Sequence, residues 1–305
     1  MIAILNHKGK IPFEEKINED KLLLSTIENV FKIKRKFIAK MPQEGEAVVA
    51  CFSGGQDSIA NVAILLKELK LNVYPFFINH GQSNYKFEKE SCDFFNEYFK
   101  ENYPEKYHNY LEIGCNTPGL EYKDILRIAK KMVDPLPLRH NISYPARNPV
   151  IFLTGMEYGY ALQAKGVKIN TIFAAHVSSD SSYHCSLTWG RIMNLLMCQI
   201  TNNWNWQFLS LPIEIEFGNY YDKDVWIKWC IENKIPIEKA RTCVKKFNLQ
   251  CGDCPTCWDR RRVYNELGIS DPTPYLFQMG KHYPTYYQHE EEEKRINEKG
   301  NRNKN

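Results

Sequence analysis

A short glycine-containing turn between an apolar strand and a helix limits the folds that this chain can adopt. Residues 47–52 are apolar and read as a buried strand, and residues 58–70 carry apolar side chains at helical spacing. Between them, Ser53–Ser58 reads Ser-Gly-Gly-Gln-Asp-Ser. Glycines allow a tight turn, and the N–H groups at a helix N-terminus favour an anion. The pattern therefore predicts an α/β fold in which this turn binds a phosphate group.

Strand and helix patterns alternate after this turn. Further strands are expected at residues 73–78, 110–113, 169–177 and 208–213, and further helices at 148–165 and 222–233. Asn148 is expected to cap the first of these helices, with Pro149 at its first position. Another helix is expected earlier, at residues 22–41. Apolar strands that alternate with helices predict a parallel sheet with helices on both faces.

Four of the ten cysteines are clustered late in the chain. Cys243, Cys251, Cys254 and Cys257 follow the spacing C-x7-C-x2-C-x2-C. Four soft sulfur ligands at short spacings suit one tetrahedral Zn²⁺, which we favour over an iron–sulfur cluster. A closed four-sulfur site leaves no position for substrate, so we expect a structural metal. The other six cysteines are scattered, and all except Cys185 are expected to be buried packing residues.

The charge balance of the chain is nearly even. Its 305 residues include 40 Lys plus Arg and 36 Asp plus Glu, a net charge of +4 that is too weak to indicate nucleic-acid or membrane binding. No apolar run approaches the roughly 18 residues that span a bilayer, and residues 1–10 lack the features of a signal peptide. We therefore expect a cytoplasmic protein whose clustered cysteines bind metal rather than form disulfides.

The turn resembles a known phosphate-binding loop. Neither G-x-x-x-x-G-K-[ST] nor G-x-G-x-x-G occurs in the chain. Ser-Gly-Gly-x-Asp-Ser after an apolar strand instead resembles the PP-loop of the N-type ATP pyrophosphatases. In that superfamily the loop holds the pyrophosphate part of ATP while the α-phosphate is attacked. The resemblance implies activation of a carboxylate, amide or carbonyl group by AMP transfer.

The turn and the cysteine cluster together resemble one family, the 7-cyano-7-deazaguanine synthases (QueC). The resemblance spans about residues 46–275. It is carried by Ser53–Ser58, Gly81 and Gln82, residues 144–148 (Tyr-Pro-Ala-Arg-Asn), Lys223, residues 251–260, Gly268, and residues 271–275 (Asp-Pro-Thr-Pro-Tyr). The last of these segments is close to the ending typical of the family.

The resemblance implies a fold, a reaction and a set of site residues. The fold is a Rossmann-like sheet of the HUP type followed by a small zinc subdomain. With ATP and Mg²⁺, the family adenylates the carboxylate of 7-carboxy-7-deazaguanine; ammonia then forms the amide, and a second activation yields the nitrile. The implied catalytic residues are Ser53, Asp57 and Ser58. ATP binding is expected from Phe52, Ser53, Gly54, Gly55, Gln56, Asp57, Ser58, Arg147 and Asn148, and substrate binding from Gly81, Gln82, Asp180, Tyr183 and Cys185.

Four segments are expected along the chain. Residues 1–45 form a partly helical N-terminal extension, and residues 46–240 form the ATP-binding α/β domain. Residues 241–285 form the zinc-binding subdomain. Residues 286–305 include four consecutive glutamates without an apolar face, which predicts a disordered charged tail.

Two segments depart from the pattern of the family. Residues 79–84 read Asn-His-Gly-Gln-Ser-Asn where the family has Asp-Tyr-Gly-Gln-Arg/Lys-His, and residues 183–186 read Tyr-His-Cys-Ser where it has Tyr-Pro-Asp-Cys-Arg. The loss of charged partners should alter which ligand is held. Asp180 could accept a hydrogen bond from an exocyclic amine, and Cys185 or His184 could act near the reacting carbon.

These departures leave the purpose of the adenylation open. One interpretation is the biosynthetic enzyme itself. The other is a QueC-like enzyme of an antiphage system, which joins a deazaguanine acyl group to the amino terminus of a partner protein. A tRNA-modifying PP-loop enzyme fits the weak net charge poorly, and a zinc-ribbon module that binds nucleic acid through Arg260–Arg262 leaves the turn without a role. A homodimer is compatible with either leading interpretation.

Overall fold

The structure, a computed structural model, describes residues 5–115, 147–180 and 182–277. The chain divides into two compact units, Met1–Arg241 and Thr242–Asn305. The segment before residue 46, predicted as a partly helical N-terminal extension, falls in the first of these units together with the sheet. Among the described helices, none has the length and apolar character needed to cross a membrane.

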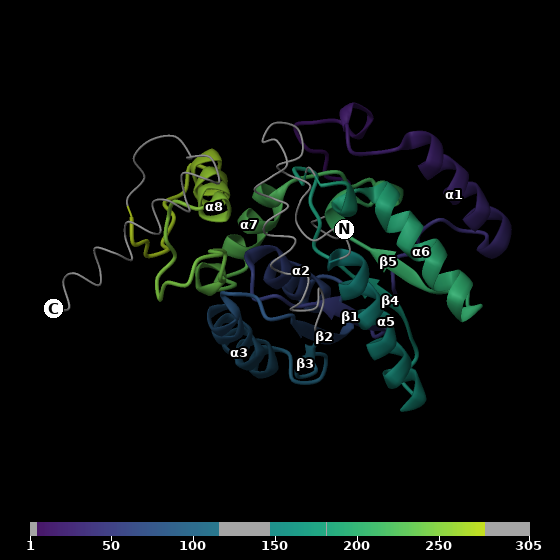
Figure 1. Cartoon of the computed structure of the whole chain (residues 1–305), viewed down its shortest axis with the longest axis horizontal. Coiled ribbons are helices and arrows are strands. Elements are labelled where there is room, and N and C mark those ends of the chain that lie inside the picture. The colour runs from purple at the N-terminus through teal and green to yellow at the C-terminus, as the bar shows by residue number, and fades with distance from the viewer. Residues whose placement is uncertain (1–4, 116–146, 181, 278–305) are drawn as a thin grey trace, which may run out of the picture. The chain divides into compact units, whose positions relative to one another are not determined.

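Five parallel strands form the sheet of the first unit: β1 (Ala47–Cys51), β2 (Asn72–Asn79), β3 (Leu111–Gly114), β4 (Ile169–Phe173) and β5 (Gln207–Leu209). Their order across the sheet is β3-β2-β1-β4-β5 (Figure 1). The order reverses between β1 and β4, and ligands of open parallel sheets bind beyond the carboxyl ends of the strands at such a switch point. The predicted Rossmann-like parallel sheet is confirmed.

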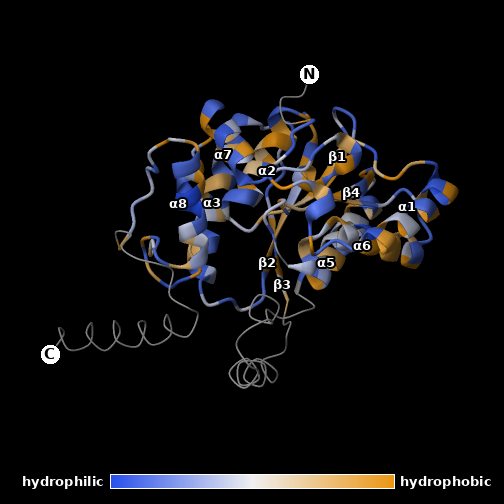
Figure 2. Cartoon of the chain, turned by 90° about the horizontal axis from the view of Figure 1, so that it is seen from above, coloured by the Kyte–Doolittle hydropathy of each residue, from blue (hydrophilic) through white to orange (hydrophobic). Residues whose placement is uncertain are grey.

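Helices cover both faces of this sheet (Figure 1, Figure 2). One face carries α5 (Arg147–Ala164) and α6 (Leu187–Thr201), and the other carries α2 (Gln56–Lys67), α3 (Tyr85–Asn102) and α7 (Lys223–Glu232). Successive residues of a strand face opposite sides of the sheet. Because both sides are covered by helices, Val48 and Val49 of β1 are both fully buried. Val49 belongs to the core beneath α5 and α6, together with Trp206. Figure 2 shows helices that mix hydrophobic and hydrophilic residues, as expected where one side packs on a sheet.

Further elements lie outside these layers. The helix α1 (Lys21–Arg35) packs along α6 (Figure 1), and α8 (Pro255–Glu266) begins directly after Cys254 in the second unit. Short 3-10 helices are found at Phe13–Glu15, Tyr183–Cys185, Leu211–Ile213, Ile215–Phe217 and Ile237–Lys239.

The boundaries of several elements differ from the predictions. The helix α1 ends at Arg35 rather than near residue 41, because Lys36 takes a left-handed conformation with a φ of 67°. Strand β4 ends at Phe173, four residues before the expected end. Asn148, expected as a helix cap, lies inside α5. The patterns also did not predict α3, which buries only Ser91, Cys92, Phe95 and Phe99, or α6, whose apolar residues lie on most sides.

A buried ion pair joins α6 to the segment after β5. The two Nη atoms of Arg191 donate hydrogen bonds to the two carboxylate oxygens of Glu214 at 2.8 and 2.6 Å, and Nε donates to Glu28 of α1 at 3.1 Å. The side chain of Arg191 is 1% exposed. Burial alone would lower the pKa of this guanidinium, but the charges and hydrogen bonds of Glu214 and Glu28 raise it. The two carboxylates therefore stabilise a charge in the core and hold α1 against α6.

Replacing Arg191 with methionine is expected to lower the free energy of unfolding by about 3–5 kcal/mol, because Glu214 would remain as a buried charge without its partner. Denaturant unfolding followed by tryptophan fluorescence measures the change. Lys228→Met is the control, since Lys228 and Glu232 form an ion pair in which both side chains are 61% exposed. The control is expected to change stability by less than about 1 kcal/mol. Equally small losses in both variants would contradict a stabilising role for the buried pair.

Candidate functional site

The turn after β1 takes a backbone conformation that requires glycine at position 54. Gly54 has a φ of 72°, and a Cβ atom there would lie 2.7 Å from the carbonyl oxygen of Glu88. The carbonyl oxygen of Gly54 accepts hydrogen bonds from the Ser91 hydroxyl and from the Arg241 N–H, both at 2.8 Å. These contacts hold the turn against α3 and fix the direction in which the chain enters α2.

Two serines and the start of α2 surround the turn with hydrogen-bonding groups. The Ser58 hydroxyl donates to the carbonyl oxygen of Gly55 at 2.9 Å and accepts from the Ser53 N–H at 3.2 Å. The hydroxyl oxygens of Ser53 and Ser58 are also 3.2 Å apart. Because α2 begins directly after Gly55, the N–H groups of its first turn adjoin this loop. Hydroxyls and N–H groups at a helix N-terminus suit a phosphate.

Asp57 adds a carboxylate to the first turn of α2. Its Oδ2 atom lies 3.5 Å from Nζ of Lys223, at the start of α7. The Lys223 ammonium offsets the negative charge of Asp57 and restricts its side chain. Carboxylate oxygens are the ligands that Mg²⁺ prefers. The turn thus combines N–H donors for a phosphate with a carboxylate that suits a divalent cation.

A cavity of about 360 Å³ lies over the carboxyl ends of β1, β2 and β4. The residues expected to bind ATP or substrate that line it are Phe52, Ser53, Gly55, Asp57, Ser58, Gln82 and Asn148. The side-chain amide of Gln82 is held in place, because it donates to the carbonyl oxygen of Ile78 at 3.1 Å and to Glu88 at 2.9 Å. The structure therefore brings the turn together with residues that follow β2 and begin α5.

The remaining expected substrate residues lie outside the lining of this cavity. Gly81 precedes Gln82, while Asp180, Tyr183 and Cys185 belong to the loop 178–186. The carboxylate of Asp180 accepts a hydrogen bond from the Val177 N–H at 3.1 Å, and Tyr183 is 62% exposed. Gly54 and Gln56 shape the turn without lining the cavity. The side chain of Arg147 and residues 144–146 lie outside the described part of the chain.

Asn148 links this loop to the cavity. Its Nδ2 atom donates to the carbonyl oxygen of His184 at 3.1 Å and lies 3.6 Å from the sulfur of Cys185. A side chain of the cavity lining therefore holds the backbone of the loop, and any displacement of one affects the other.

The N-terminal segment supports the same loop from outside. Nδ2 of Asn18 donates to the carbonyl oxygens of Asp180 and Ser182 at 3.2 and 3.1 Å, and Nζ of Lys16 donates to another carbonyl of the loop. The carboxylate of Glu19 accepts from two N–H groups at the start of α6, at 2.7 and 2.8 Å. The path of the loop therefore depends on residues far away in the sequence.

The cavity is also lined by residues that were not among the expected binding residues, among them His80, Glu88, Phe152 and His176. His176 follows the end of β4 by three residues, whereas the expected strand 169–177 placed it inside a strand. Its side chain is buried, and this burial, with a smaller effect of His184, lowers the pKa of His176 to about 3. The imidazole is therefore neutral at physiological pH.

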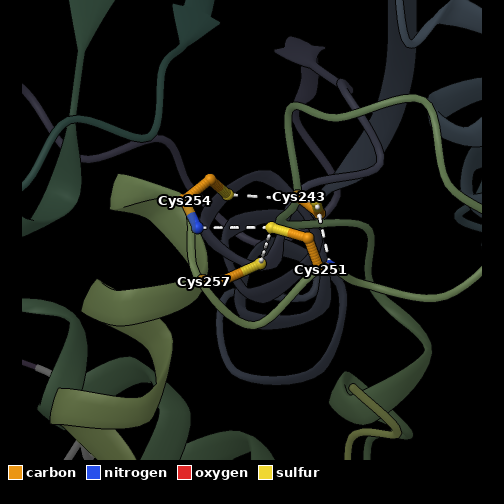
Figure 3. A group of neighbouring side chains, drawn as sticks. All are labelled: Cys243, Cys251, Cys254 and Cys257. Carbon is orange, nitrogen blue, oxygen red and sulfur yellow. Dashed lines mark hydrogen bonds between the residues drawn. The ribbon is translucent and has the colours of Figure 1, made fainter. Parts of the chain in front are cut away.

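The four clustered cysteines meet in space in the second unit (Figure 3). Their sulfur atoms lie within 4.8 Å of one another, and all four residues are buried. The sulfurs of Cys251 and Cys257 are 3.9 Å apart, as are those of Cys254 and Cys243. A tetrahedral metal with bonds of about 2.3 Å separates its sulfur ligands by roughly 3.8 Å. The four cysteines could therefore hold one metal ion.

Backbone N–H groups point at these sulfurs. The sulfur of Cys243 accepts from the N–H groups of Lys245 and Cys251 at 3.4 and 3.3 Å. The sulfur of Cys251 accepts from Asp253 and Cys254 at 3.4 and 3.2 Å. Hydrogen bonds of this kind stabilise the thiolate, which is the form that binds a metal.

Comparison with known protein families shows to which family the chain belongs. Residues 47–268 match the family model described as "Queuosine biosynthesis protein QueC". The chain belongs to the QueC family. The resemblance to this family is therefore confirmed.

Relatives within the QueC family share modest identity with the chain over most of its length. The 7-cyano-7-deazaguanine synthase of Acetivibrio thermocellus is 27% identical over 230 residues, which cover 75% of this chain and 97% of that protein. The synthase of Thermoplasma acidophilum is 22% identical over 246 residues, which cover 80% and 96%. Among solved structures, U34-tRNA thiolase NcsA from Methanococcus maripaludis with its 4Fe-4S cluster is 12% identical. The match covers 83% of this chain and 76% of the NcsA chain. Its TM-score of 0.35 is too low to support a conclusion.

Gly54→Ala is expected to lower the free energy of unfolding by about 1–3 kcal/mol, because alanine resists a positive φ and its Cβ would clash with the carbonyl of Glu88. Gly55→Ala is the matched control. Gly55 has a φ of -78°, and a Cβ there would meet its nearest atom, the Ser53 hydroxyl oxygen, at 3.4 Å. Denaturant unfolding compares the two variants. Equal losses would contradict the requirement for glycine at position 54.

Cys254→Ser is expected to weaken metal binding by more than about tenfold, because a hydroxyl is a poorer ligand than a thiolate for a soft metal. Elemental analysis of the purified protein, after dialysis against a mild chelator, measures the metal retained per chain. Cys230→Ser is the control, since Cys230 is equally buried but lies in α7 outside the cluster. Loss of metal in both variants, or in neither, would contradict a site made by the cluster.

Proposed function

We propose that this protein is an ATP-dependent ligase that adenylates the carboxylate of 7-carboxy-7-deazaguanine and forms a carbon–nitrogen bond, as a step towards 7-cyano-7-deazaguanine. The observation that carries the proposal is the turn Ser53–Ser58, which opens at the switch point of the sheet into a cavity of about 360 Å³. Membership of the QueC family supports the identity of the acid.

The proposed reaction makes a poor electrophile reactive. A carboxylate oxygen of the acid attacks the α-phosphorus of ATP, the bond from that phosphorus to the bridging oxygen breaks, and pyrophosphate leaves. Ammonia then attacks the acyl carbon, AMP leaves with the former carboxylate oxygen, and an amide results. A second ATP activates the amide oxygen in the same way. Loss of AMP and of the two amide protons then gives the nitrile.

The residues of the turn would bind the part of ATP that leaves. N–H groups at the start of α2 would hydrogen-bond the pyrophosphate oxygens. The hydroxyls of Ser53 and Ser58, which contact each other in the structure, would turn towards the same oxygens. Asp57 would hold Mg²⁺, which when bound offsets the charge that develops on the leaving pyrophosphate. Lys223, 3.5 Å from Asp57, would orient that carboxylate.

The metal of the cysteine cluster is proposed to be a structural Zn²⁺. Four sulfur donors at tetrahedral separation leave no open position for a substrate. The expected finding is about one zinc per chain and no effect of the metal on the chemistry of the turn. Iron in place of zinc would contradict this part of the proposal.

Ammonia is the acceptor that we propose, and the amino terminus of a partner protein is the second candidate. The match to the biosynthetic family supports ammonia. The departures at residues 79–84 and 183–186, together with the segment that precedes the family match at residue 47, are the reason to keep the second candidate. Mass spectrometry distinguishes them when the protein is incubated with ATP, the acid, and either ammonia or candidate partner proteins. A free nitrile supports biosynthesis, and a partner protein heavier by the deazaguanine acyl group supports conjugation.

Asp57→Asn is expected to lower AMP formation from ATP and 7-carboxy-7-deazaguanine by about 10²-fold or more, because the amide binds Mg²⁺ weakly and loses the ion pair with Lys223. Chromatographic measurement of AMP gives the rate, and metal analysis should show an unchanged zinc content. Asp93→Asn is the matched control, since Asp93 pairs with Lys89 on the exposed side of α3. No AMP from the unmodified protein with any deazaguanine acid would contradict the proposed function.

A further inference from the structure

His176 lies in the wall of the cavity with a ring nitrogen that the described protein does not satisfy. The residue is 8% exposed and lines the cavity together with Ala174 and Ala175. Its Nδ1 atom is fully buried and has no hydrogen-bond partner among residues 5–115, 147–180 and 182–277. Buried polar atoms of native proteins are nearly always paired, so an unpaired nitrogen on a residue of the cavity wall suggests a partner that enters the cavity and reaches it through a small rotation of the ring.

Aromatic side chains fix the direction of this imidazole. The ring of Phe152 meets it edge-on at 5.7 Å between centroids, and the rings of Trp189 and Phe208 lie at 5.9 and 6.0 Å. These rings surround the imidazole with apolar surface and restrict its rotation. The two alanines before His176 have short side chains, which leaves room in the cavity next to the imidazole.

The neutral state of His176 indicates the kind of group that it binds. Because burial keeps the imidazole uncharged, it offers one hydrogen-bond donor and one acceptor but no positive charge for a phosphate. Phosphate-binding groups are already gathered at the other side of the switch point, at the turn after β1. Apolar side chains of Phe76, Ile151 and Phe152 also line the cavity and can pack on a planar ring. An uncharged polar edge of a heterocycle fits this combination.

We propose that His176 hydrogen-bonds the heterocyclic base of the acid substrate and determines which base the site accepts. The inference rests on the proposed function, since it assigns one residue to the base and the turn to ATP. It makes His176 a specificity residue rather than a group that takes part in the adenylation. The residue lies at the carboxyl end of β4, across the switch point from the turn at the end of β1.

Three substitutions at one position test this assignment. His176→Phe keeps a ring against Phe152 and Trp189 but removes both nitrogens, and it is expected to raise the KM and the Kd for 7-carboxy-7-deazaguanine about tenfold. The KM for ATP and the kcat should change by less than twofold. His176→Asn places an amide where Nδ1 lies and should retain affinity within about threefold of the unmodified protein. His176→Gln, whose amide reaches the position of Nε2, should lose affinity as the phenylalanine variant does.

His108→Phe is the matched control, because His108 is also stacked on an aromatic ring, that of Tyr74 at 3.7 Å, but lies outside the cavity lining. It should alter neither affinity. Thermal unfolding of each variant checks the fold. If the phenylalanine variant does not fold, the difference in acid affinity between His176→Asn and His176→Gln tests the assignment. An equal loss of ATP affinity, or an unchanged affinity for the acid in the phenylalanine and glutamine variants, would overturn the assignment.

Failure of the proposed function gives a different result from failure of this inference. If the unmodified protein forms no AMP from the acid, the proposed function fails. Calorimetric binding of 7-deazaguanine and guanine to the unmodified protein and to His176→Phe then tests the residue directly. A base that binds the unmodified protein about tenfold more tightly than it binds His176→Phe supports the role of His176. Equal binding to both proteins, or no binding of either base, overturns it.

Discussion

Two hydrogen bonds to one carbonyl oxygen, that of Gly54, hold the part of the molecule on which the site depends. Ser91 of α3 and the N–H of Arg241 donate to this oxygen, so the turn is tied to two segments that lie far apart in the sequence. This support stabilises the positive φ of Gly54, which in turn sets where α2 begins. The N–H groups of α2, the two serines and Asp57 then face one cavity as a consequence of how a single peptide group is held.

The parts of the structure that the sequence could predict are those that local chemistry decides. The parallel sheet and the position of the turn follow from apolar runs and glycine, and the meeting of four thiols agrees with their spacing. His176 was not indicated, because its place at the cavity depends on β4 ending at Phe173, and the apolar pattern continues to residue 177. Asn148 has the residue type of a helix cap, yet it lies inside α5 and bonds to the loop 178–186. The pairing of Arg191 with Glu214 and Glu28 joins three distant segments, and no local pattern encodes it.

The segment before the family match supports the loop 178–186 through hydrogen bonds. Asn18 and Glu19 hold this loop and the start of α6 mainly through backbone atoms. Backbone contacts constrain the path of a loop without depending on its side chains. The side chains at residues 183–186 can therefore vary while the loop keeps its place.

The two strands at the switch point supply different chemistry to the crevice between them. The end of β1 supplies N–H groups, hydroxyls and a carboxylate, which suit a charged phosphate and its cation. The end of β4 supplies two alanines and a neutral imidazole, which suit an uncharged ring. The turn would meet the charge of a nucleotide locally, so binding one there does not depend on the net charge of the chain, which is +4.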